Sequence, residues 1–582
     1  MILSTWDYLI IVSFISLIVF VGLRFKNKAS KDTNSFFLGG RNLPWWIAGT
    51  SMVATTFAAD TPLAVTELVA QSGISGNWLW WNMMIGGMFT TFFFAKYWRR
   101  AQILTDVEFL ELRYSGTSAS FLRGFRAVYL GLFLNAIIIG WVNLAMMSLL
   151  EVFFELSKIE ALAATAFLML LVAIYSGLSG LLGVVYTDVI QFIAAMAGSI
   201  ILAVIVLNSN EINGISNLKA ALPDGTLSFV PTIDFNNSLS ENSEILTLSL
   251  GSFLAFIGFQ WWASWYPGNE PGGGGYIAQR MMSTKNEKHA IYSSLFFQIA
   301  HYCLRPWPWI IVALCAVVLY PELPEADYKL GYAMAMKDFL PNGLRGLLLA
   351  AFLAAYMSTI STQLNWGSSY LLNDFYRRFI KPESSEQHYI FASRMINLFL
   401  MVFAIFITSQ IESISNVWKF LIEAGAGLGL VLIVRWFWWR VNAWSEIAAT
   451  VIPLICYALS RYGLNMEFPE TFFITVGGTT IGWIIITLVT PKVDHRHLKN
   501  FYDKIKPAGN WKPFSEGKNP ENKKVISLIL SWLISVVLGY SLLFSLGHIV
   551  LENWDQLPLS LGLFLMSTLL LNKITSKIEL FK

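Results

Sequence analysis

The sequence predicts an all-α polytopic membrane protein with about fifteen membrane-spanning helices. Of the 582 residues, 55% are hydrophobic and only 13% are charged, whereas soluble domains carry about 25% charged residues. The mean hydropathy is +0.56. The 23 Trp and 21 Tyr suit the aromatic belts at membrane interfaces. We therefore expect the lipid bilayer to be the main solvent and a partner of this chain.

Apolar stretches of the required length follow one another along the chain. A helix needs about 20 residues, most of them apolar, to cross the hydrocarbon core. The last two stretches and the division at Ser179 and Gly180 are the least distinct. The expected spans are 6–24, 44–70, 77–97, 124–155, 160–180, 183–208, 244–266, 289–320, 343–376, 389–410, 415–438, 443–460, 470–490, 524–547 and 557–573.

Basic residues divide the loops into two groups. When the expected helices alternate in direction, the basic loops fall on one side and the acidic or mixed loops 209–243 and 321–342 fall on the other. Because cytoplasmic loops carry an excess of Lys and Arg, we expect the N-terminus outside and the C-terminus inside, in the plasma (inner) membrane of a bacterium. The basic positions are Arg24, Lys26, Lys28, Lys31, Arg41, Arg99, Arg100, Arg113, Arg123, Arg126, Arg280, Lys285, Lys288, Arg377, Arg378, Lys381, Arg440, Lys492, Arg496, Lys499, Lys504 and Lys506.

The composition disfavours several classes of function. A net charge of +3 leaves no electrostatic footprint for nucleic acid. Cys303, Cys315 and Cys456 lie in apolar runs without a CxxC pair, so they fit buried hydrophobic positions better than a metal site or a disulfide. Neither HExxH nor GxSxG occurs, and the six His are scattered. We therefore expect no enzyme and no organic cofactor.

The second expected span, 44–70, is interrupted near its middle. Pro62 has no amide hydrogen to donate and disfavours helix at the preceding residue. Small and hydroxyl residues surround it, and Asp60 places a carboxylate at mid-depth. Because lipid cannot satisfy freed backbone carbonyls, such a break must face protein or water.

The seventh expected span, 244–266, leads into a run rich in proline and glycine, 267–275 (PGNEPGGGG). A hinge or loop is an ordinary explanation, and a nucleotide-binding loop is disfavoured because no strand precedes the run. Two Gly/Pro-interrupted spans in corresponding positions are typical of inverted-repeat transporters. The expected division is a first helix and loop at 1–43, a first repeat at 44–208, an extracytoplasmic loop at 209–243, a second repeat at 244–440 and additional helices at 441–582.

Two adjacent hydroxyl residues, Ser358 and Thr359, follow Ala355 in the ninth expected span. Carbonyl oxygens of a broken helix together with two hydroxyls would provide an oxygen shell for sodium. The alternative is that these hydroxyls bond their own backbone or a neighbouring helix, as Ser and Thr in membrane helices often do.

Asp188 is an ionisable residue in the sixth expected span, 183–208. Ionisable residues inside spans are candidates for functional sites. A carboxylate near the start of a helix can equally be an ordinary N-cap. The residue types leave both interpretations open.

Taken together, these residues resemble the sodium:solute symporter family, which includes sodium–glucose, sodium–proline and sialic acid transporters. The resemblance implies the LeuT-type fold, with a core of five plus five helices in inverted repeats. It covers residues 5–440, with the order and spacing of the elements kept. The matching stretches are 39–46 (GGRNLPWW), 175–180 (YSGLSG), 187–191 (TDVIQ), 276–280 (YIAQR) and 355–365 (AYMSTISTQLN).

The resemblance also implies a sodium site, with Na+ as the coupling ion and no other metal. Asp188 matches an acidic residue that in some members holds a second sodium with the same hydroxyl pair. The alternative implied by the resemblance is that Asp188 shapes the exit path of the first ion, so one or two sodium ions both remain open. The residues at the principal site are Ala54, Phe57 and Ala355 through their carbonyls, and Ser358 and Thr359 through their side chains.

The expected solute site departs from that of the sugar transporters in this family. Thr56, Thr61 and Trp80 stand where those proteins have Asn, Gln and Glu, so the main partners of sugar hydroxyls are missing. Arg305 lies inside the eighth span and can hold a carboxylate by two hydrogen bonds. Its alternatives are an internal pair with Glu270 or Asp60, or extension to the membrane interface.

The residues at the seventh break complete the candidate solute contacts. Gln260, Trp261 and Trp262 are expected to face a central cavity, or alternatively to form an aromatic packing seam. The full set of candidates is Thr56, Asp60, Thr61, Trp80, Gln260, Trp261, Trp262 and Arg305.

We therefore expect a secondary active transporter that couples symport of a small polar organic solute to sodium by alternating access, and that works as a monomer. An uncoupled permease or a membrane solute sensor that keeps the fold is the alternative. The residues do not distinguish a sugar, an amino acid, a nucleoside or a carboxylate as the solute.

Overall fold

The chain folds as an assembly of helices, two of which are interrupted. The computed structural model describes residues 3–24, 38–103, 105–176, 180–231, 246–266, 270–515 and 519–578. Within these ranges the β-type pairings are isolated bridges, and nine helices are long and apolar enough to cross a membrane. The expected all-α polytopic fold is confirmed. Helices or interrupted helices occupy all the expected spans, while the number of membrane crossings stays a prediction.

The helices before the first long loop include the first break. They are α1 (Thr5–Arg24), α4 (Trp45–Thr55), α5 (Asp60–Ser72), α6 (Trp78–Trp81), α7 (Met83–Phe93), α8 (Ala95–Ala101), α9 (Phe109–Arg113), α10 (Gly116–Val128), α11 (Asn135–Phe154), α12 (Lys158–Ser176), α13 (Gly180–Leu207) and α14 (Ile215–Ala221). A π-helical segment, Tyr129–Leu134, joins α10 to α11.

The later helices include the second break. They are α15 (Leu250–Ala255), α16 (Trp261–Ala263), α17 (Gly275–Met282), α18 (Glu287–Ile299), α19 (Pro306–Leu319), α20 (Leu330–Phe339), α21 (Leu344–Ser369), α22 (Glu386–Thr408), α23 (Ile414–Ala424), α24 (Leu428–Phe437), α25 (Ala443–Ala458), α26 (Glu470–Val489), α27 (His495–Ile505), α28 (Val525–Val550) and α29 (Leu557–Lys577). Further π-helical segments are Phe256–Gln260, Ala300–Leu304, Tyr370–Ile380 and Leu459–Gly463.

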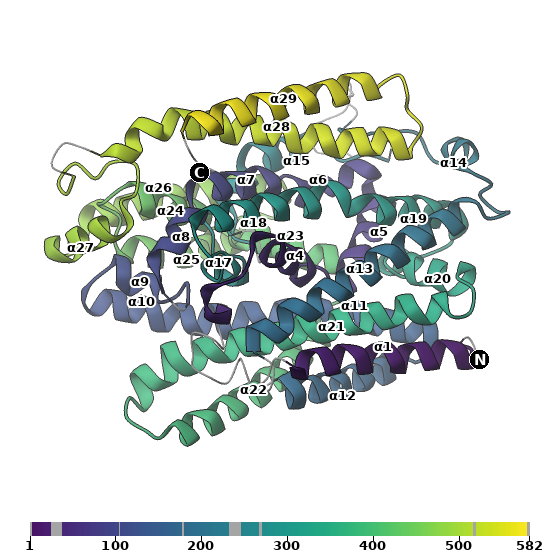
Figure 1. Ribbon diagram of the computed structural model, residues 1–582, viewed down its shortest axis with the longest axis horizontal. Helices are drawn as coiled ribbons and strands as arrows, with labels where there is room; N and C mark the ends of the chain where they lie inside the picture. Colours follow the sequence, from purple (N-terminus) through teal and green to yellow (C-terminus); the bar gives the residue numbers. More distant parts are fainter. Residues whose placement is uncertain are drawn as a thin grey trace.

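Figure 1 shows most of the long helices running along one common direction. Helices α28 and α29 form one edge of the view, α1, α12 and α22 lie toward the opposite edge, and the broken helix α4 lies between them. The N-terminus, α14 and α20 lie at one end of the bundle, whereas α9, α10 and α27 lie at the other. The described parts of the acidic stretches, 209–231 and 321–342, thus lie at the end opposite α9, α10 and α27.

The first break lies where the sequence predicts it. Helix α4 ends at Thr55 and α5 begins at Asp60. Pro62 lies in the first turn of α5, where the missing amide hydrogen removes no intrahelical bond. The chain therefore leaves the helix just before the proline, and the last carbonyls of α4 lose regular helical partners: the Ala54 carbonyl accepts from the Phe57 amide at 2.9 Å and the Val53 carbonyl from the Thr56 hydroxyl at 2.8 Å.

The second break separates α16 from α17. The backbone is extended at Ser264, and Pro267, Gly268 and Asn269 lie outside the described residues. Gly272 has φ of +79°, and a Cβ atom there would come within 2.6 Å of the Leu432 carbonyl oxygen. Only glycine fits this close approach of two backbones.

Two details of the sixth span differ from the sequence-based interpretation. Helix α12 ends at Ser176 and α13 begins at Gly180, which agrees with the expected division, although 177–179 lie outside the described residues. Asp188 is therefore well inside α13 rather than at its first turn. An ordinary N-cap role for Asp188 is excluded.

Three arginines assigned to basic loops are instead buried. Arg126 lies in α10 and pairs with Glu446 at 2.9 Å, and Arg113 is also buried. Arg280 belongs to α17 and is 1% exposed. Their assignment to loops is wrong, because a basic residue near a loop has the same sequence pattern whether its side chain faces water or a buried partner.

The side chain of Asp7 joins the first helix to α21. Its Oδ1 atom accepts hydrogen bonds from the amides of Gly343 and Gly346, both at 2.7 Å. Asp7→Ala should leave two amides at the start of α21 without partners, which costs about 1–3 kcal/mol for a buried group. We expect a lower melting temperature in detergent. Asp7→Asn keeps an acceptor oxygen and is the matched control; equal losses in the two variants would contradict this role.

Candidate ion and solute site

A closed cavity lies between the two breaks. Thr56 and Tyr266 are half-buried and every other lining residue is buried. The cavity therefore has no broad opening to solvent in this state. It is lined by Thr55, Thr56, Ala58, Asp60, Thr61, Trp80, Met83, Ile138, Trp141, Val142, Tyr266, Tyr276, Phe297, His301, Tyr302, Arg305, Thr359, Gln363 and Trp418.

Arg305 contacts the end of the first broken helix. The Nη1 group of Arg305 donates to the carbonyl oxygens of Val53 and Thr56, both at 3.0 Å. Its guanidinium carbon lies 5.0 Å from the ring centroid of Trp309. With 1% exposure, the side chain does not extend to an interface. Its hydrogen-bond partners are backbone carbonyls, and it also attracts the Asp60 carboxyl group electrostatically without a direct hydrogen bond to it.

Asp60 opens α5 and faces the same cavity. Its Oδ2 atom accepts a hydrogen bond from the indole Nε1 of Trp141 at 2.8 Å, and Oδ1 accepts one from the Thr61 hydroxyl at 3.3 Å. A carboxylate in the first turn also interacts favourably with the helix dipole. Asp60 therefore presents a buried, hydrogen-bonded carboxyl group to the cavity wall.

The π-helical segment after α18 supplies aromatic and polar groups that the sequence interpretation missed. His301 Nδ1 lies 2.9 Å from the Thr56 hydroxyl. The ring of Tyr302 stacks on Trp80 with centroids 5.6 Å apart. Trp80 is thus in the cavity wall as expected, but its neighbours are two residues that had no distinguishing sequence pattern.

On the other side of the α4 end, Asp188 joins three helices. Its Oδ1 atom accepts from the hydroxyl of Ser358 on α21, and its Oδ2 atom accepts from that of Ser51 on α4, both at 2.8 Å. Thr55 makes a longer contact of 3.5 Å. A carboxylate and several hydroxyls thus converge where the sequence interpretation expected an ion site.

Arg280 is a residue of this group that the sequence interpretation missed. It donates to the Ser51 hydroxyl at 3.4 Å and to the Thr55 hydroxyl at 3.2 Å. These hydroxyls are the ones that contact Asp188, and the two charges attract each other. Arg280 lies within the matching stretch 276–280, so its membership of a recognised motif was the available signal.

The remaining members of the expected sodium site lie at the same junction. The rings of Phe57 and of Phe352 on α21 are 5.9 Å apart, which brings the α4 break against the turn before Ala355. Ala54 and Ala355 are buried. Thr359 is 5% exposed, and its hydroxyl is buried without a hydrogen-bond partner among the described residues.

The three residues expected at the seventh break do not line the cavity. The amide of Gln260 donates to the Leu79 carbonyl at 2.8 Å. Trp261 packs against Trp532 with centroids 5.4 Å apart, and Trp262 packs against Phe259. The expectation that Gln260, Trp261 and Trp262 face the cavity is not met, and the two indoles form an aromatic seam.

Tyr266 and Tyr276 line the cavity instead, one on each side of the second break. The break therefore reaches the cavity, but through residues further along the chain. Other lining residues that were not anticipated are Trp141, Gln363 and Trp418. No motif distinguishes them in an apolar, Trp-rich chain, since their position depends on how distant helices pack.

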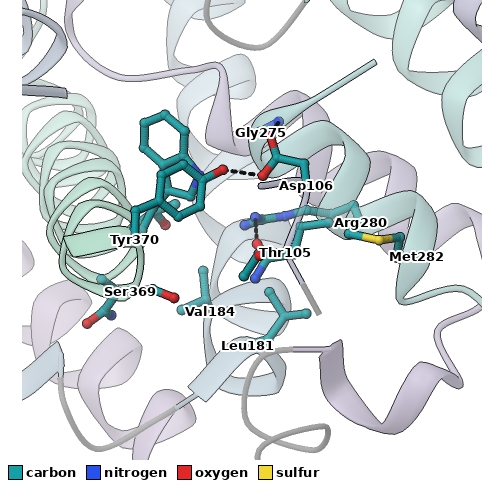
Figure 2. Close-up of a pocket in the computed structure, with 13 residues that line it drawn as sticks. Thr105, Asp106, Leu181, Val184, Gly275, Arg280, Met282, Ser369 and Tyr370 are labelled. Carbon is teal, nitrogen blue, oxygen red and sulfur yellow. Dashed lines mark hydrogen bonds between the residues drawn. The ribbon is translucent and has the colours of Figure 1, made fainter. Parts of the chain in front are cut away.

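A second cavity lies next to Arg280 and is more open (Figure 2). Figure 2 shows Asp106 between Tyr370, whose hydroxyl donates to it, and Gly275, whose amide donates to it at 3.0 Å. Helices α17 and α21 contribute residues to both cavities. The second cavity is lined by Thr105, Asp106, Leu181, Val184, Gly275, Gln279, Arg280, Met282, Thr362, Asn365, Trp366, Ser369 and Tyr370.

A buried cavity with aromatic and polar lining between two broken membrane helices, together with a carboxylate and hydroxyls converging beside one break, defines a secondary transporter. The model of the sodium:solute symporter family matches residues 36–452. The chain belongs to this family, and its members are transporters rather than enzymes.

Individual relatives agree with this membership. The chain is 25% identical to the sodium/glucose cotransporter of Vibrio parahaemolyticus over 510 residues, which is 81% of this chain and 88% of that protein. It is 25% identical to a sodium/sialic acid symporter of Proteus mirabilis over 507 residues, 83% of this chain and 95% of that one. A solved sodium-coupled sialic acid symporter superimposes with a TM-score of 0.65 at 20% identity, covering 84% of this chain and 99% of that one. The LeuT-type fold is thereby confirmed.

Proposed function

We propose that this protein is a sodium-coupled symporter of a small polar organic solute that works by alternating access. The observation that carries the proposal is the junction of α4, α13 and α21. There Asp188 contacts Ser358, and the neighbouring Thr359 hydroxyl has no hydrogen-bond partner among the described residues. A buried hydroxyl beside a broken helix and a carboxylate suits a hard cation.

The sodium ion would be held by the carbonyl oxygens of Ala54, Phe57 and Ala355 and by the side chains of Ser358 and Thr359. The packing of Phe57 on α21 supports this set, because it brings the α4 break to that helix. Asp188 would hold a second sodium through Ser358, with Arg280 balancing its charge when that ion is absent.

The solute would occupy the closed cavity. Thr56, Asp60, Thr61, Trp80 and Arg305 support this, because all of them line it. The role proposed for Gln260, Trp261 and Trp262 is indirect. Their packing outside the cavity lining would position the helix that leads to Tyr266. Rocking of one helix bundle against the other would then connect the closed cavity with either side of the membrane.

We further propose that the protein works as a monomer in the inner membrane of a bacterium, with the N-terminus outside. The separation of loops in Figure 1 supports this orientation, since the end that holds α9, α10 and α27 carries the basic loops. The second cavity, near the expected cytoplasmic end of α21, would then be the inner vestibule. The repeats at 44–208 and 244–440 would be the moving units.

Sodium itself provides the first test, because it needs no knowledge of the solute. A ligand that binds only the folded state at roughly 100 times its Kd stabilises by about 2.7 kcal/mol. We expect the melting temperature of the purified protein to rise with NaCl and not with KCl at equal ionic strength. Equal responses to the two salts would count against sodium binding and favour an uncoupled permease or sensor.

A further inference from the structure

We propose that the solute carries a carboxylate, and that the free edge of Arg305 holds it. This inference rests on the proposed symport function, because it names the substrate class for the same closed cavity. It uses only the contacts of Arg305 and the chemistry of the surrounding wall.

One of the three nitrogens of the Arg305 guanidinium group is hydrogen-bonded to the protein, and the other two lack partners among the described residues. Nη1 donates to the carbonyls of Val53 and Thr56, while Nε and Nη2 are buried and have no hydrogen-bond partner among the described residues. Nε and Nη2 form one edge of the planar group, with two parallel N–H bonds. This is the geometry that binds both oxygens of one carboxylate.

The aromatic neighbours of Arg305 hold this edge in place. The guanidinium carbon lies 5.0 Å from the ring centroid of Trp309 and 5.9 Å from that of Phe57. Burying charged donors without partners is unfavourable, so two open positions on a fixed side chain in a cavity wall indicate a ligand. An anion with two oxygens in one plane would accept hydrogen bonds from both Nε and Nη2.

The rest of the cavity indicates the body of the solute. Trp80, Trp141, Tyr302 and Trp418 offer apolar ring surface. Trp418 Nε1 and Gln363 Oε1 have no hydrogen-bond partner among the described residues, so one donor and one acceptor remain for further polar groups. Arg305 is the single Arg or Lys among the described residues that line the cavity, so a second carboxylate would find no cationic partner there. The best fit is a monocarboxylate with an apolar or aromatic body.

Arg305 also connects this anion to the sodium site. Val53 and Thr56, whose carbonyls it holds, are the chain neighbours of Ala54 and Phe57, whose carbonyls are proposed to bind sodium. A carboxylate on Arg305 and a sodium ion at the break would thus stabilise the same short segment. We therefore expect sodium to raise the affinity for the carboxylate, and the carboxylate to raise the affinity for sodium by the same factor.

The test compares matched pairs of solutes on the purified full-length protein in NaCl. The pairs are nicotinate and nicotinamide, L-proline and L-prolinamide, glycine betaine and choline, and glucuronate and glucose. We expect a carboxylate member to raise the melting temperature and its partner not to. Arg305→Lys keeps the charge but loses the planar edge, so the carboxylate Kd should rise roughly 10–100-fold, the effect of losing a charge-assisted hydrogen bond.

Arg113→Lys is the matched control, because Arg113 is also fully buried but donates to the carbonyls of Arg435 and Trp438 away from the cavity. It should leave the carboxylate Kd unchanged. If Arg305→Lys does not fold, the comparison of matched pairs on the unmodified protein still tests whether binding requires a carboxylate. A partner without a carboxylate that stabilises as well as the matched carboxylate overturns the inference.

Uptake into proteoliposomes separates this inference from the proposed function. Sodium-driven uptake of an uncharged solute such as glucose would overturn the carboxylate inference and leave symport intact. Carboxylate binding that needs the Arg305 edge, but with uptake indifferent to a sodium gradient, would support the inference and contradict symport.

Discussion

Replacing both Ser358 and Thr359 with alanine is expected to abolish the stabilisation of the protein by sodium and any sodium-driven uptake. The two side chains are adjacent on α21, where Ser358 contacts Asp188 and the Thr359 hydroxyl has no hydrogen-bond partner in the part of the chain that the structure describes. Their removal takes away two of the oxygens proposed for the ion. The measurement is the melting temperature in NaCl against KCl, followed by solute uptake with and without a sodium gradient.

A control in the same helix separates loss of the ion from loss of packing. Ser368→Ala also removes a buried hydroxyl from α21, but that hydroxyl donates to the Asn365 carbonyl within its own helix at 3.2 Å. It should keep the full response to sodium. A Ser358→Ala, Thr359→Ala double variant that responds to sodium as the unmodified protein does would place the ion elsewhere.

The single variants should differ in a way that follows from their contacts. Ser358→Ala removes a hydrogen bond to a buried carboxylate, so it should lower stability even in KCl. Thr359→Ala removes a hydroxyl that has no hydrogen-bond partner among the described residues, so its effect should be confined to NaCl. This contrast distinguishes an ion ligand from a structural hydroxyl.

The helical segments and both breaks could be predicted from the sequence because their causes are local. A membrane span needs a fixed apolar length, and helix α13, with 28 residues, is about 42 Å long at 1.5 Å per residue. Pro62 and the run at 267–275 interrupt the apolar pattern wherever the neighbouring helices lie. Such features need no knowledge of tertiary contacts.

The composition of the cavity wall depends on non-local packing instead. His301 and Tyr302 face Trp80 because α18 continues as a π-helical segment, which changes the direction of its side chains. Hydrophobic periodicity does not reveal such a segment. The aromatic residues of the cavity wall are therefore evident only from the folded structure. Arg305, which follows the same segment, could be identified from the sequence because a charge inside an apolar span is unusual.

The errors at Arg280 and at Trp261 have different origins. A basic residue near the end of a span fits the positive-inside rule, which conceals that Arg280 turns inward towards Ser51 and Thr55. Trp261 and Trp262 stand beside a real break, but their indoles donate back to the carbonyls of Ile257 and Gly258. Which residues near a break face the cavity therefore depends on the backbone geometry at the break, and closeness in sequence does not predict it.

Asp188→Asn is expected to lower both the stability of the protein and its affinity for sodium. Asp188 is 1% exposed and is bridged to Arg280 through the hydroxyls of Ser51 and Thr55. Removing one charge leaves the other buried without its counterion, which typically costs about 3–5 kcal/mol. Because hydroxyls separate these charges, we expect the lower end of that range. The measurement is the melting temperature in KCl and its rise with NaCl.

A double variant separates the two roles of Asp188. Asp188→Asn with Arg280→Gln removes both charges, so stability in KCl should recover relative to Asp188→Asn alone, as in a double-mutant cycle for a coupled pair. The response to sodium should stay weak, because the carboxylate proposed to hold a second ion is still missing. Recovery of both properties would show that Asp188 serves only to balance Arg280. In that case the coupling would involve one sodium ion, held at the α4 break by Ser358 and Thr359.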